Sequence, residues 1–205
     1  MCNYDIEHEL INRNYRYICG VDEVGRGAAF GPVAAGAVIL NPERLNPELN
    51  DSKKLSPKKR LELAKFIYRN AVAYSIGWSW NDEIDEINIL QATKKAMKMA
   101  VKGLQIIPDY VLMDGMKPDF IDIKGEGIIG GDSISFSIAA ASIIAKVFRD
   151  ELMTAFSPRF PQYFLENHKG YLTAQHLNAI STNGLTEFHR KSFEIGKTTW
   201  QKTEL

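Results

Sequence analysis

The chain has 205 residues, of which 45% are hydrophobic, so it is long enough to bury a sizeable core within one domain. Its 25 lysines and arginines balance its 25 aspartates and glutamates, so the net charge neither indicates nor excludes a polyanionic partner. Only Cys2 and Cys19 are present, which excludes a disulfide framework, and neither a secretion signal nor a membrane-length apolar run occurs, so we expect a cytoplasmic protein that contacts no membrane.

The chain opens with two predicted strands that lie side by side. Residues 15–21 form an apolar run typical of a strand that enters a core, and residues 33–40 form a second one. The prolines within residues 41–50 indicate a loop. The pair Ser56-Pro57 has the residue types preferred at the N-cap and first position of a helix, which the apolar spacing continues to about residue 70.

A strand, a long helix and a further strand are predicted next. Residues 72–80 return as a strand, and Asn81 or Asp82 is predicted to cap a helix to about residue 104 whose apolar stripe lies on the sheet. Residues 110–113 are wholly apolar, which is typical of a short, buried central strand.

The last part of the chain is predicted to be mainly helical. Residues 128–132 repeat the pattern of an apolar run that ends in glycine and aspartate, and Ser133 or Ser135 begins a buried helix over residues 137–156. Short helical segments such as residues 173–181 and a frayed tail from Lys197 are expected after it.

The alternation of strands and helices predicts an α/β fold, a mixed β-sheet flanked by helices. We expect a single domain over residues 1–205, in which a small helical C-terminal part, from about residue 158 to residue 205, packs on the rest.

Four acidic residues share one local context. Asp22, Glu23, Asp114 and Asp132 each follow an apolar, strand-like segment and adjoin glycine, so we expect the four carboxylates to converge. For the Asp-Glu pair alone, a solvated strand end is the commoner meaning. Clustered carboxylates repel one another unless cations neutralise them, and oxygen-only ligands favour Mg²⁺ or Mn²⁺ over zinc.

A two-metal site of this kind predicts nuclease chemistry. Two ions about 4 Å apart activate a water and stabilise the leaving oxygen of an in-line phosphoryl displacement. Competing chemistries have less support, because the sequence contains no phosphate-binding P-loop, no H-E-x-x-H zinc motif and no serine nucleophile elbow.

Basic and aromatic residues supply candidate contacts to nucleic acid. A basic cluster with two serines opens the first long helix: Ser52, Lys53, Lys54, Ser56, Lys58, Lys59 and Arg60. A solvated helix face is the alternative, but a carboxylate metal site beside the cluster favours phosphate contacts.

Basic and aromatic side chains also occur together later in the chain. Lys146 and Asp150 are near one end of the buried helix. Asp150 is a candidate for a further metal ligand, for a base and for an ion-pair partner of Lys146 or Arg149, and we favour the ion pair. Residues 168–171 and 189–193 interleave basic with aromatic side chains, which suits backbone contact and stacking on a sugar or base. A lone aromatic residue is otherwise most often part of a core.

As a set, the motifs resemble those of the type 2 ribonucleases H, ribonuclease HII, in their short bacterial form. The resemblance is carried by GVDEVGRGAAFGPV, DSKKLSPKKR, a strand ending in MDG, GGDSISFSIAAASIIAKVFRD, HKGYLTAQH and HRKSF, in family order from Ile18 to Phe193. Agreement of so many ordered motifs over nearly the whole chain is not expected by chance.

The resemblance implies a ribonuclease H-like fold and roles for particular residues. It places the metal-site carboxylates on Asp22, Glu23, Asp114 and Asp132. It implies that the backbone of Gly25, Arg26 and Gly27 senses the ribose 2′-hydroxyl, which distinguishes RNA from DNA, and that Tyr171 packs on the nucleotide beside the junction. Ser52, Lys53 and Lys146 complete the expected substrate-binding set.

The implied activity is endonucleolytic. The resemblance predicts cleavage of the RNA strand of RNA–DNA hybrids and incision 5′ to single ribonucleotides in duplex DNA, with 3′-hydroxyl and 5′-phosphate ends. It further implies two Mn²⁺ or Mg²⁺ ions during catalysis, a monomer, and a role in removing ribonucleotides from DNA. The short region before the first strand and the intact Gly-Arg-Gly pattern favour type 2 over type 3.

Two positions depart from the commonest bacterial pattern, and two other functions stay open. Ala28 stands where proline is frequent, and Gly130 stands where lysine is frequent. The loss of that lysine is expected to weaken a local phosphate contact. The alternatives are a catalytically silent nucleic-acid-binding module and a DNA-directed nuclease of the same superfamily, since fold alone does not fix function.

Overall fold

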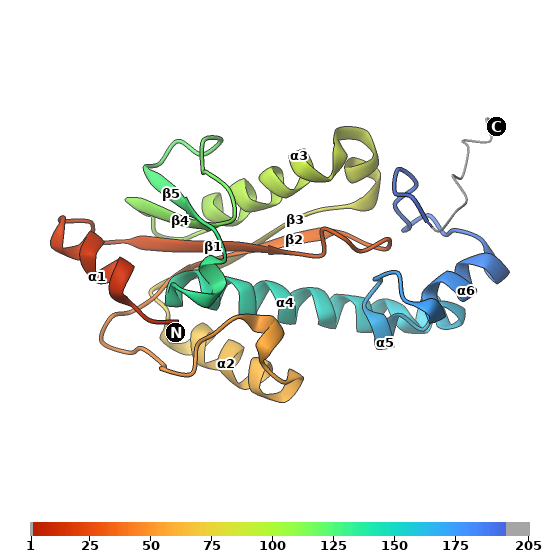
Figure 1. The fold of residues 1–205 in the computed structure, drawn as a ribbon, viewed down its shortest axis with the longest axis horizontal. Coiled ribbons are helices and arrows are strands. Elements are labelled where there is room, and N and C mark those ends of the chain that lie inside the picture. The colour runs from red at the N-terminus through yellow and green to blue at the C-terminus, as the bar shows by residue number, and fades with distance from the viewer. Residues whose placement is uncertain (1, 196–205) are drawn as a thin grey trace.

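The computed structural model describes residues 2–195 and contains a five-stranded mixed sheet with helices on both faces (Figure 1). The strands are β1 (Ile18–Val24), β2 (Val33–Ile39), β3 (Ala73–Ser79), β4 (Tyr110–Asp114) and β5 (Gly125–Ile128). Their order in the sheet is β3-β2-β1-β4-β5. The first three strands pair antiparallel, whereas β4 runs parallel to both β1 and β5. The predicted α/β fold with a mixed sheet is confirmed.

The helices are α1 (Asp5–Asn12), α2 (Pro57–Asn70), α3 (Asn81–Lys102), α4 (Phe136–Phe156), α5 (Leu165–His168) and α6 (Ala174–Asn183). Four short 3₁₀ turns join them: η1 (Ser52–Lys54), η2 (Gly131–Ser133), η3 (Ser157–Arg159) and η4 (Pro161–Tyr163). None of the helices within residues 2–195 combines the length and apolar character needed to cross a membrane. The tail predicted to fray from Lys197 lies outside the described residues.

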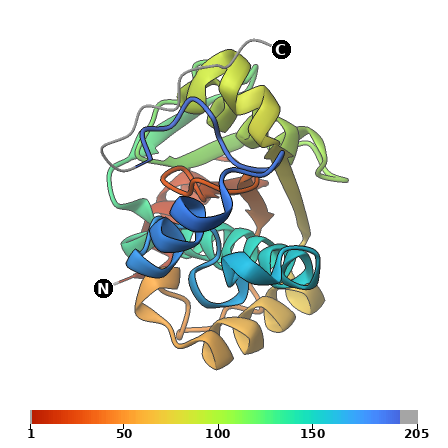
Figure 2. The same cartoon turned by 90° about the vertical axis from the view of Figure 1, so that its right-hand side faces the viewer.

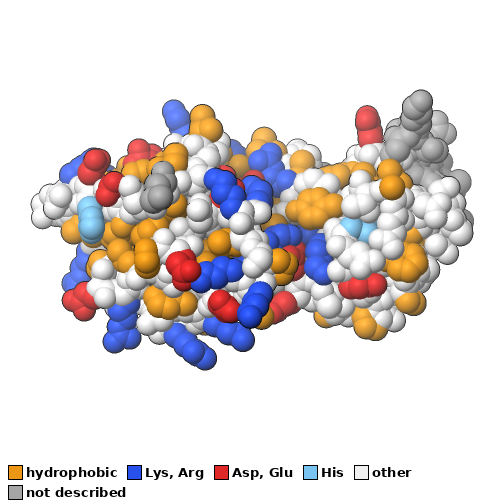
Figure 3. Space-filling model, turned by 60° about the horizontal axis from the view of Figure 1, so that its bottom comes forward, with side chains coloured by type: hydrophobic (Ala, Val, Ile, Leu, Met, Phe, Trp, Pro, Cys, Tyr) orange, Lys and Arg blue, Asp and Glu red, His pale blue; other side chains and the backbone are white. Residues whose placement is uncertain are grey.

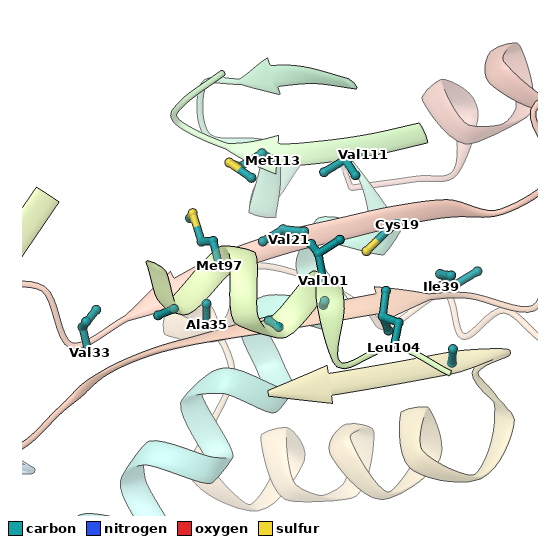
Figure 4. Close-up of a cluster of buried hydrophobic side chains, with 14 of the residues drawn as sticks. Cys19, Val21, Val33, Ala35, Ile39, Met97, Val101, Leu104, Val111 and Met113 are labelled. Atoms are coloured by element: carbon teal, nitrogen blue, oxygen red, sulfur yellow. The ribbon is translucent and has the colours of Figure 1, made fainter. Parts of the chain in front are cut away.

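One apolar core lies between α3 and the sheet. The alternate residues Cys19 and Val21 of β1 and Val111 and Met113 of β4 face Met97 of α3 (Figure 4). Strand residues two apart share a face of the sheet, so this pattern assigns the odd-numbered residues of β1 to the α3 side. The even-numbered residues Gly20 and Asp22 therefore face the opposite layer, which α4 and α2 form.

The second layer packs very close to the sheet. A Cβ on Gly20 would lie 2.0 Å from the carbonyl carbon of Ser137, so only glycine lets α4 approach β1 this closely. The first half of α4 is buried on all sides, as its composition predicts, and the Ser135 hydroxyl caps it by accepting from the Ile138 N–H. This close approach carries Ser142 of α4 to the neighbourhood of Asp22.

The C-terminal helices α5 and α6 lie at the far end of α4, beyond the end of the sheet at which β1 finishes (Figures 1 and 2). An aromatic cluster joins them to the segment between β1 and β2, because Phe30 packs against Phe156, Phe160 and Phe188. The helical character predicted for the C-terminal part is confirmed for the described residues. This part is in direct contact with the loop that follows β1.

Several predicted element boundaries differ from the structure. The sequence did not predict α1, whose first turn carries the fully buried Glu7. No side chain caps α3, although Asn81 or Asp82 was expected to do so. Instead the Asn81 side chain donates to the carbonyl of Glu187, 2.7 Å away, in the C-terminal part. A tertiary contact has replaced the local one.

Candidate active site

Two adjacent parallel strands bring Asp22 and Asp114 together. Val21 of β1 lies opposite Met113 of β4, so the two aspartates are the next residues on neighbouring strands. β4 ends at Asp114, whereas β1 continues to Val24. The β4 side of β1 is therefore free of strand pairing where the carboxylates begin.

The sequence prediction that β1 ends at residue 21 is wrong. Asp22 and Glu23 both lie within the strand, opposite Gly36 and Ala35 of β2. Neighbouring side chains of a strand point to opposite faces of the sheet. Because no turn occurs at Asp22 and Glu23, these two residues alone do not bring their carboxylates to one site. The shared neighbour is Asp114, whose charge opposes ionisation of both carboxylates.

Burial and like charge disfavour ionisation of this group. Burial raises the pKa of Asp22 well above its ordinary value, and the charges of Glu23 and Asp114 raise it further. Hydrogen bonds from the Ser142 hydroxyl and the Glu23 N–H favour the carboxylate form of Asp22 and act in the opposite sense. Burial also raises the pKa of Glu23, against the nearby guanidinium of Arg26.

Asp132 reaches the same region from a 3₁₀ turn and not from a strand end. β5 ends at Ile128, and Asp132 lies in η2, immediately before α4. The turn is fixed to β4, because the Gly131 N–H donates to Asp114 Oδ1 over 2.6 Å. Burial raises the pKa of Asp132, and the charges of Asp51 and Asp114 add to that effect.

A cavity of about 440 Å³ unites most of the predicted site. Its walls contain nine of the eleven candidate residues, together with Val24 and Ser142: Asp22, Glu23, Gly25, Arg26, Gly27, Ser52, Lys53, Lys146 and Tyr171. Asp114 and Asp132 do not line it. They adjoin it through charge interactions with Asp22 and Lys53.

Basic side chains neutralise the carboxylates in this arrangement. Lys53 Nζ lies 3.6 Å from Asp132 Oδ2, and Arg26 Nη1 lies 3.2 Å from Glu23 Oε1. Lys146 pairs with Asp150 over 2.6 Å, which confirms one of the two predicted partners of that aspartate. Arg60 is the second partner, at 3.4 Å, whereas Arg149 is not in contact with it by an ion pair.

The basic cluster at the start of α2 is divided between structural and exposed roles. Arg60 is held by the carbonyls of Ser52 and Leu55, and Lys59 pairs with Glu48. Lys53 and Lys54 are exposed on η1, next to the cavity. Figure 3 shows Lys and Arg side chains along the part of the surface that α2 forms.

The Gly-Arg-Gly segment follows β1 directly and lies beside Tyr171. Gly25 has φ +89°, a left-handed conformation that glycine adopts readily. Ala28 forms an antiparallel bridge with Tyr171 and so joins the segment after β1 to the one that follows α5. Gly130 has φ +66°, a conformation that glycine also adopts readily.

The chemistry of the donors fits divalent cations of the Mg²⁺ or Mn²⁺ type. Across residues 2–195, no three histidine, cysteine, aspartate or glutamate side chains are arranged to hold an ion as they stand. Three of the four carboxylates instead contact Arg26, Lys53 and the Gly131 N–H. The donors are nevertheless all oxygens, and their mutual repulsion is the electrostatic condition that a divalent cation relieves.

Sequence reasoning missed two residues that support the site. Ser142 bonds to Asp22 and its hydroxyl lies 2.9 Å from that of Ser52. Asp51 accepts from the Lys53 N–H and contributes negative charge beside Asp132. The signal for Ser142 is a serine that, with Ser137, interrupts the otherwise apolar first half of α4. Asp51 is adjacent to the candidate Ser52 in the sequence. Unlike the four candidate carboxylates, it does not follow a strand-like segment.

Comparison with known proteins identifies the family. A family model described as Ribonuclease HII matches residues 19–199. The chain belongs to the ribonuclease HII family. It is 46% identical to a Ribonuclease HII of Caldicellulosiruptor saccharolyticus, over 93% of each chain. It is 51% identical to a Ribonuclease HII of Shouchella clausii, over 91% of this chain and 72% of that one. Members of this family are hydrolytic endoribonucleases that act on nucleic acid, and so is this chain.

Solved structures confirm the ribonuclease H-like fold. The ribonuclease H2 of Pyrococcus horikoshii has a TM-score of 0.69 at 22% identity and covers 88% of this chain and 95% of its own. The RNase HII in a PCNA complex from Archaeoglobus fulgidus has a TM-score of 0.74 at 20% identity, over 90% and 98%. The Bst-RNase HIII in complex with Mn²⁺ has a TM-score of 0.61 at 21% identity, over 82% and 63%.

Proposed function

We propose that this member of the ribonuclease HII family hydrolyses the RNA strand of RNA–DNA hybrids and incises duplex DNA 5′ to single ribonucleotides. The observation that supports this most strongly is the composition of one cavity. Asp22 and Glu23 line it together with the Gly25-Arg26-Gly27 segment and Tyr171. A cleavage group and a group suited to sensing ribose thus share a single space, as a ribonucleotide-directed nuclease requires.

The metal site is proposed to comprise Asp22, Glu23, Asp114 and Asp132 with two Mg²⁺ or Mn²⁺ ions during catalysis. When bound, such ions supply an activated water and stabilise the leaving 3′-oxygen, which leaves 3′-hydroxyl and 5′-phosphate ends. The Mn²⁺ complex of the structurally similar Bst-RNase HIII supports this choice of metal. Cations would replace the lysine and arginine charges that now neutralise Asp132 and Glu23.

The residues of the chain itself are proposed to bind and orient the substrate. The backbone of Gly25, Arg26 and Gly27 recognises the 2′-hydroxyl, which DNA lacks. Tyr171 supplies a ring face for the neighbouring nucleotide, and Lys146 Nζ lies 5.8 Å from the centre of that ring. Ser52, Lys53 and Lys146 contact the phosphate backbone, which provides affinity with little dependence on sequence.

The proposal extends to the chain as a whole. Residues 1–205 act as a single catalytic domain, with the helical C-terminal part contributing Tyr171, and the protein acts as a monomer in the cytoplasm. Its role there is to remove ribonucleotides from DNA. Analytical ultracentrifugation with and without a hybrid duplex tests the monomer directly.

A substrate panel tests the proposed function. Three labelled duplexes of one sequence are compared: an RNA–DNA hybrid, DNA with one ribonucleotide, and DNA alone, each with Mg²⁺, with Mn²⁺ and with a chelator. Cleavage of the first two, dependent on metal, is the expected result. Equal cleavage of the all-DNA duplex would favour a DNA-directed nuclease, and binding without cleavage would favour a silent binding module.

A further inference from the structure

Two arginines are fully buried, and within residues 2–195 neither forms an ion pair with a carboxylate. Arg149 lies on α4 and Arg190 lies in the segment after α6. A buried charge without an opposite charge has a high cost in solvation free energy, so the hydrogen bonds that it makes must compensate for that cost. Burial lowers the pKa of Arg190 to about 9, and the charge of Arg149 lowers it as well.

Both guanidinium groups donate to backbone carbonyls of the loop between β1 and β2. Arg149 Nε and Nη2 each lie 3.0 Å from an acceptor, the carbonyls of Pro32 and Phe30. Arg190 Nε and Nη1 lie 3.0 Å and 2.9 Å from the carbonyls of Gly31 and Arg26. Arg26, whose carbonyl accepts from Arg190, is the central residue of the Gly-Arg-Gly segment.

Arg149 also contacts the other half of the substrate site. A Cβ on Gly25 would lie 2.2 Å from Arg149 Nε, so Gly25 sits directly on the guanidinium. Arg149 Cζ lies 5.4 Å from the centre of the Tyr171 ring, and Arg149 Nη1 donates to the Lys169 carbonyl over 2.8 Å. One buried side chain thereby touches both segments that are proposed to recognise the ribonucleotide.

A chain of histidines fixes the backbone of Tyr171 from the other side. His176 Nδ1 lies 3.1 Å from the Tyr171 carbonyl and must donate to it, which leaves its Nε2 to accept from His189 Nε2, 3.2 Å away. His189 Nδ1 then accepts from the Thr186 N–H over 2.9 Å. Each ring has one donor and one acceptor satisfied in the neutral form, so this segment has a single well-defined arrangement.

From this geometry we infer that Arg149 and Arg190 are positioning residues for ribonucleotide recognition, although neither lines the cavity. They hold the Gly25–Gly27 segment and Tyr171 in one mutual arrangement, so that the 2′-hydroxyl sensor and the stacking ring meet the same nucleotide. A planar fork with several donors reaches two carbonyls at once, which the single ammonium of lysine does not reproduce. This inference rests on the proposed function.

The test replaces each arginine with lysine and separates recognition from stability. The single-turnover rate at saturating enzyme is measured on DNA with one ribonucleotide, together with the Kd for the all-DNA duplex. Arg149→Lys and Arg190→Lys are expected to lower the rate by about tenfold to a hundredfold, as a displacement of about 1 Å at the site would. The Kd for all-DNA is expected to stay within about twofold, because the phosphate contacts are untouched.

Two matched controls accompany these variants. Arg159→Lys changes an arginine of the same C-terminal part that packs on Phe156, Phe160 and Phe188 and is expected to leave the rate unchanged. Ile180→Val removes a methylene from the buried cluster of that part and reports what a modest loss of packing does to the rate. If the lysine variants match Ile180→Val in melting temperature and also in rate, the two arginines are only structural.

Wild-type protein provides a test that does not depend on folding of the variants. Amide hydrogen exchange of residues 26–31 and 171 is compared for the free protein and the complex with ribonucleotide-containing duplex in chelator. Protection already present in the free protein is expected, because the arginines order the loop before substrate binds. Protection that develops only in the complex would overturn the inference. Failure of the proposed function looks different, since wild-type protein would then not distinguish ribonucleotide-containing from all-DNA duplex.

Discussion

Asp22 is a buried carboxylate whose pKa is raised first by burial and then by two further carboxylates. Such a group is a poor stabiliser of the free protein, because it must lose its solvation without gaining a positive partner. Its position is explained by a ligand that carries positive charge. Asp114 lies at the centre of the same group, because its charge raises the pKa of Asp22 and of Glu23 and its Oδ1 accepts from the Gly131 N–H of the turn that carries Asp132.

Replacing either aspartate with asparagine tests this interpretation. Asp22→Asn and Asp114→Asn are expected to lower turnover by roughly a thousandfold, since several kcal/mol of transition-state stabilisation come from the bound ions. The melting temperature in chelator is expected to hold or rise, because carboxylate repulsion is removed. Asp119→Asn, at an exposed aspartate that pairs with Lys94, is the control and should keep full activity. Near-normal turnover of either site variant would make the assignment of that ligand wrong.

Lys53 is proposed both to neutralise a carboxylate of the site and to contact the phosphate backbone of the duplex. Its exposed side chain reaches Asp132 and adjoins the cavity. Lys53→Ala is expected to weaken duplex binding and to reduce the slope of log K against log salt concentration by about 0.9, one phosphate contact. Lys102→Ala, at the end of α3, should leave that slope unchanged. Fluorescence anisotropy over a salt series measures both, and equal slopes for the two variants would exclude a phosphate contact by Lys53.

Among the elements, α1 and α4 are joined at the turn that carries Asp132. The buried Glu7 of α1 accepts from the Ser135 hydroxyl at 2.6 Å and from the Ser137 N–H at 2.9 Å, at the beginning of α4. Backbone bonds from Asn3 to Ile134 and from Phe136 to Asn3 reinforce this junction. The N-terminal segment therefore braces η2, although the family model begins only at residue 19.

Removal of the Glu7 carboxylate is expected to destabilise the fold. Glu7→Ala leaves the buried Ser137 N–H without an acceptor and should lower the free energy of unfolding by about 1–3 kcal/mol. Glu9→Ala, at an exposed position of the same helix, should change it by less than about 0.5 kcal/mol. Urea denaturation measures both values. Identical midpoints for the two variants would show that the junction contributes nothing.

At the scale of the whole molecule, the C-terminal part contains three buried histidines, and the ring of His189 packs on Phe30 of the loop after β1. Burial lowers the pKa of His176 to about 4 and that of His189 to about 3, and it lowers the pKa of His168 as well. The unfolded chain takes up protons at the ordinary histidine pKa of about 6.5, so below that pH it binds more protons than the folded chain. Folded-state stability that is complete above pH 6.5 is therefore lost as the pH falls towards 4.

A comparison of variants isolates this effect. Each such histidine contributes a slope of up to about 1.4 kcal/mol per pH unit between pH 6 and pH 4.5. The acidic residues with raised pKa values act in the opposite sense, so wild type is compared with His176→Asn, which keeps a donor near the Tyr171 carbonyl. Urea denaturation over this range should show a shallower dependence for the variant. Parallel curves would mean that His176 does not titrate on unfolding.

The sequence predicts much of the fold because many of its signals are local. Ser56 and Pro57 begin α2 as expected, since the Ser56 hydroxyl accepts from the Lys59 N–H. The acids that follow apolar runs predict that carboxylates gather in one place, and nine of the eleven candidate residues line one cavity, from which Asp114 and Asp132 are absent. The full extent of β1 could not be read in this way, because its last residues are held only by pairing with β2.

The supporting residues of the site were beyond sequence reasoning because their partners are remote. Arg149 bonds to a carbonyl 117 residues away, and Arg190 to one 164 residues away. Every residue carries a backbone carbonyl, so the pattern of side chains in the sequence does not predict which carbonyl accepts these hydrogen bonds. Glu7 likewise resembles any acidic residue near a chain terminus until the fold buries it.

Mapping the cut in a DNA duplex with one central ribonucleotide is the most direct test of ribonucleotide-directed incision by this chain. The 5′-labelled strand is incubated with protein and Mg²⁺ or Mn²⁺, its product is sized to one nucleotide, and a DNA polymerase then tests whether the new end extends. A single cut on the 5′ side of the ribonucleotide with an extendable 3′-hydroxyl is the predicted result. A cut elsewhere, or an equal cut when that nucleotide lacks its 2′-hydroxyl, would contradict it.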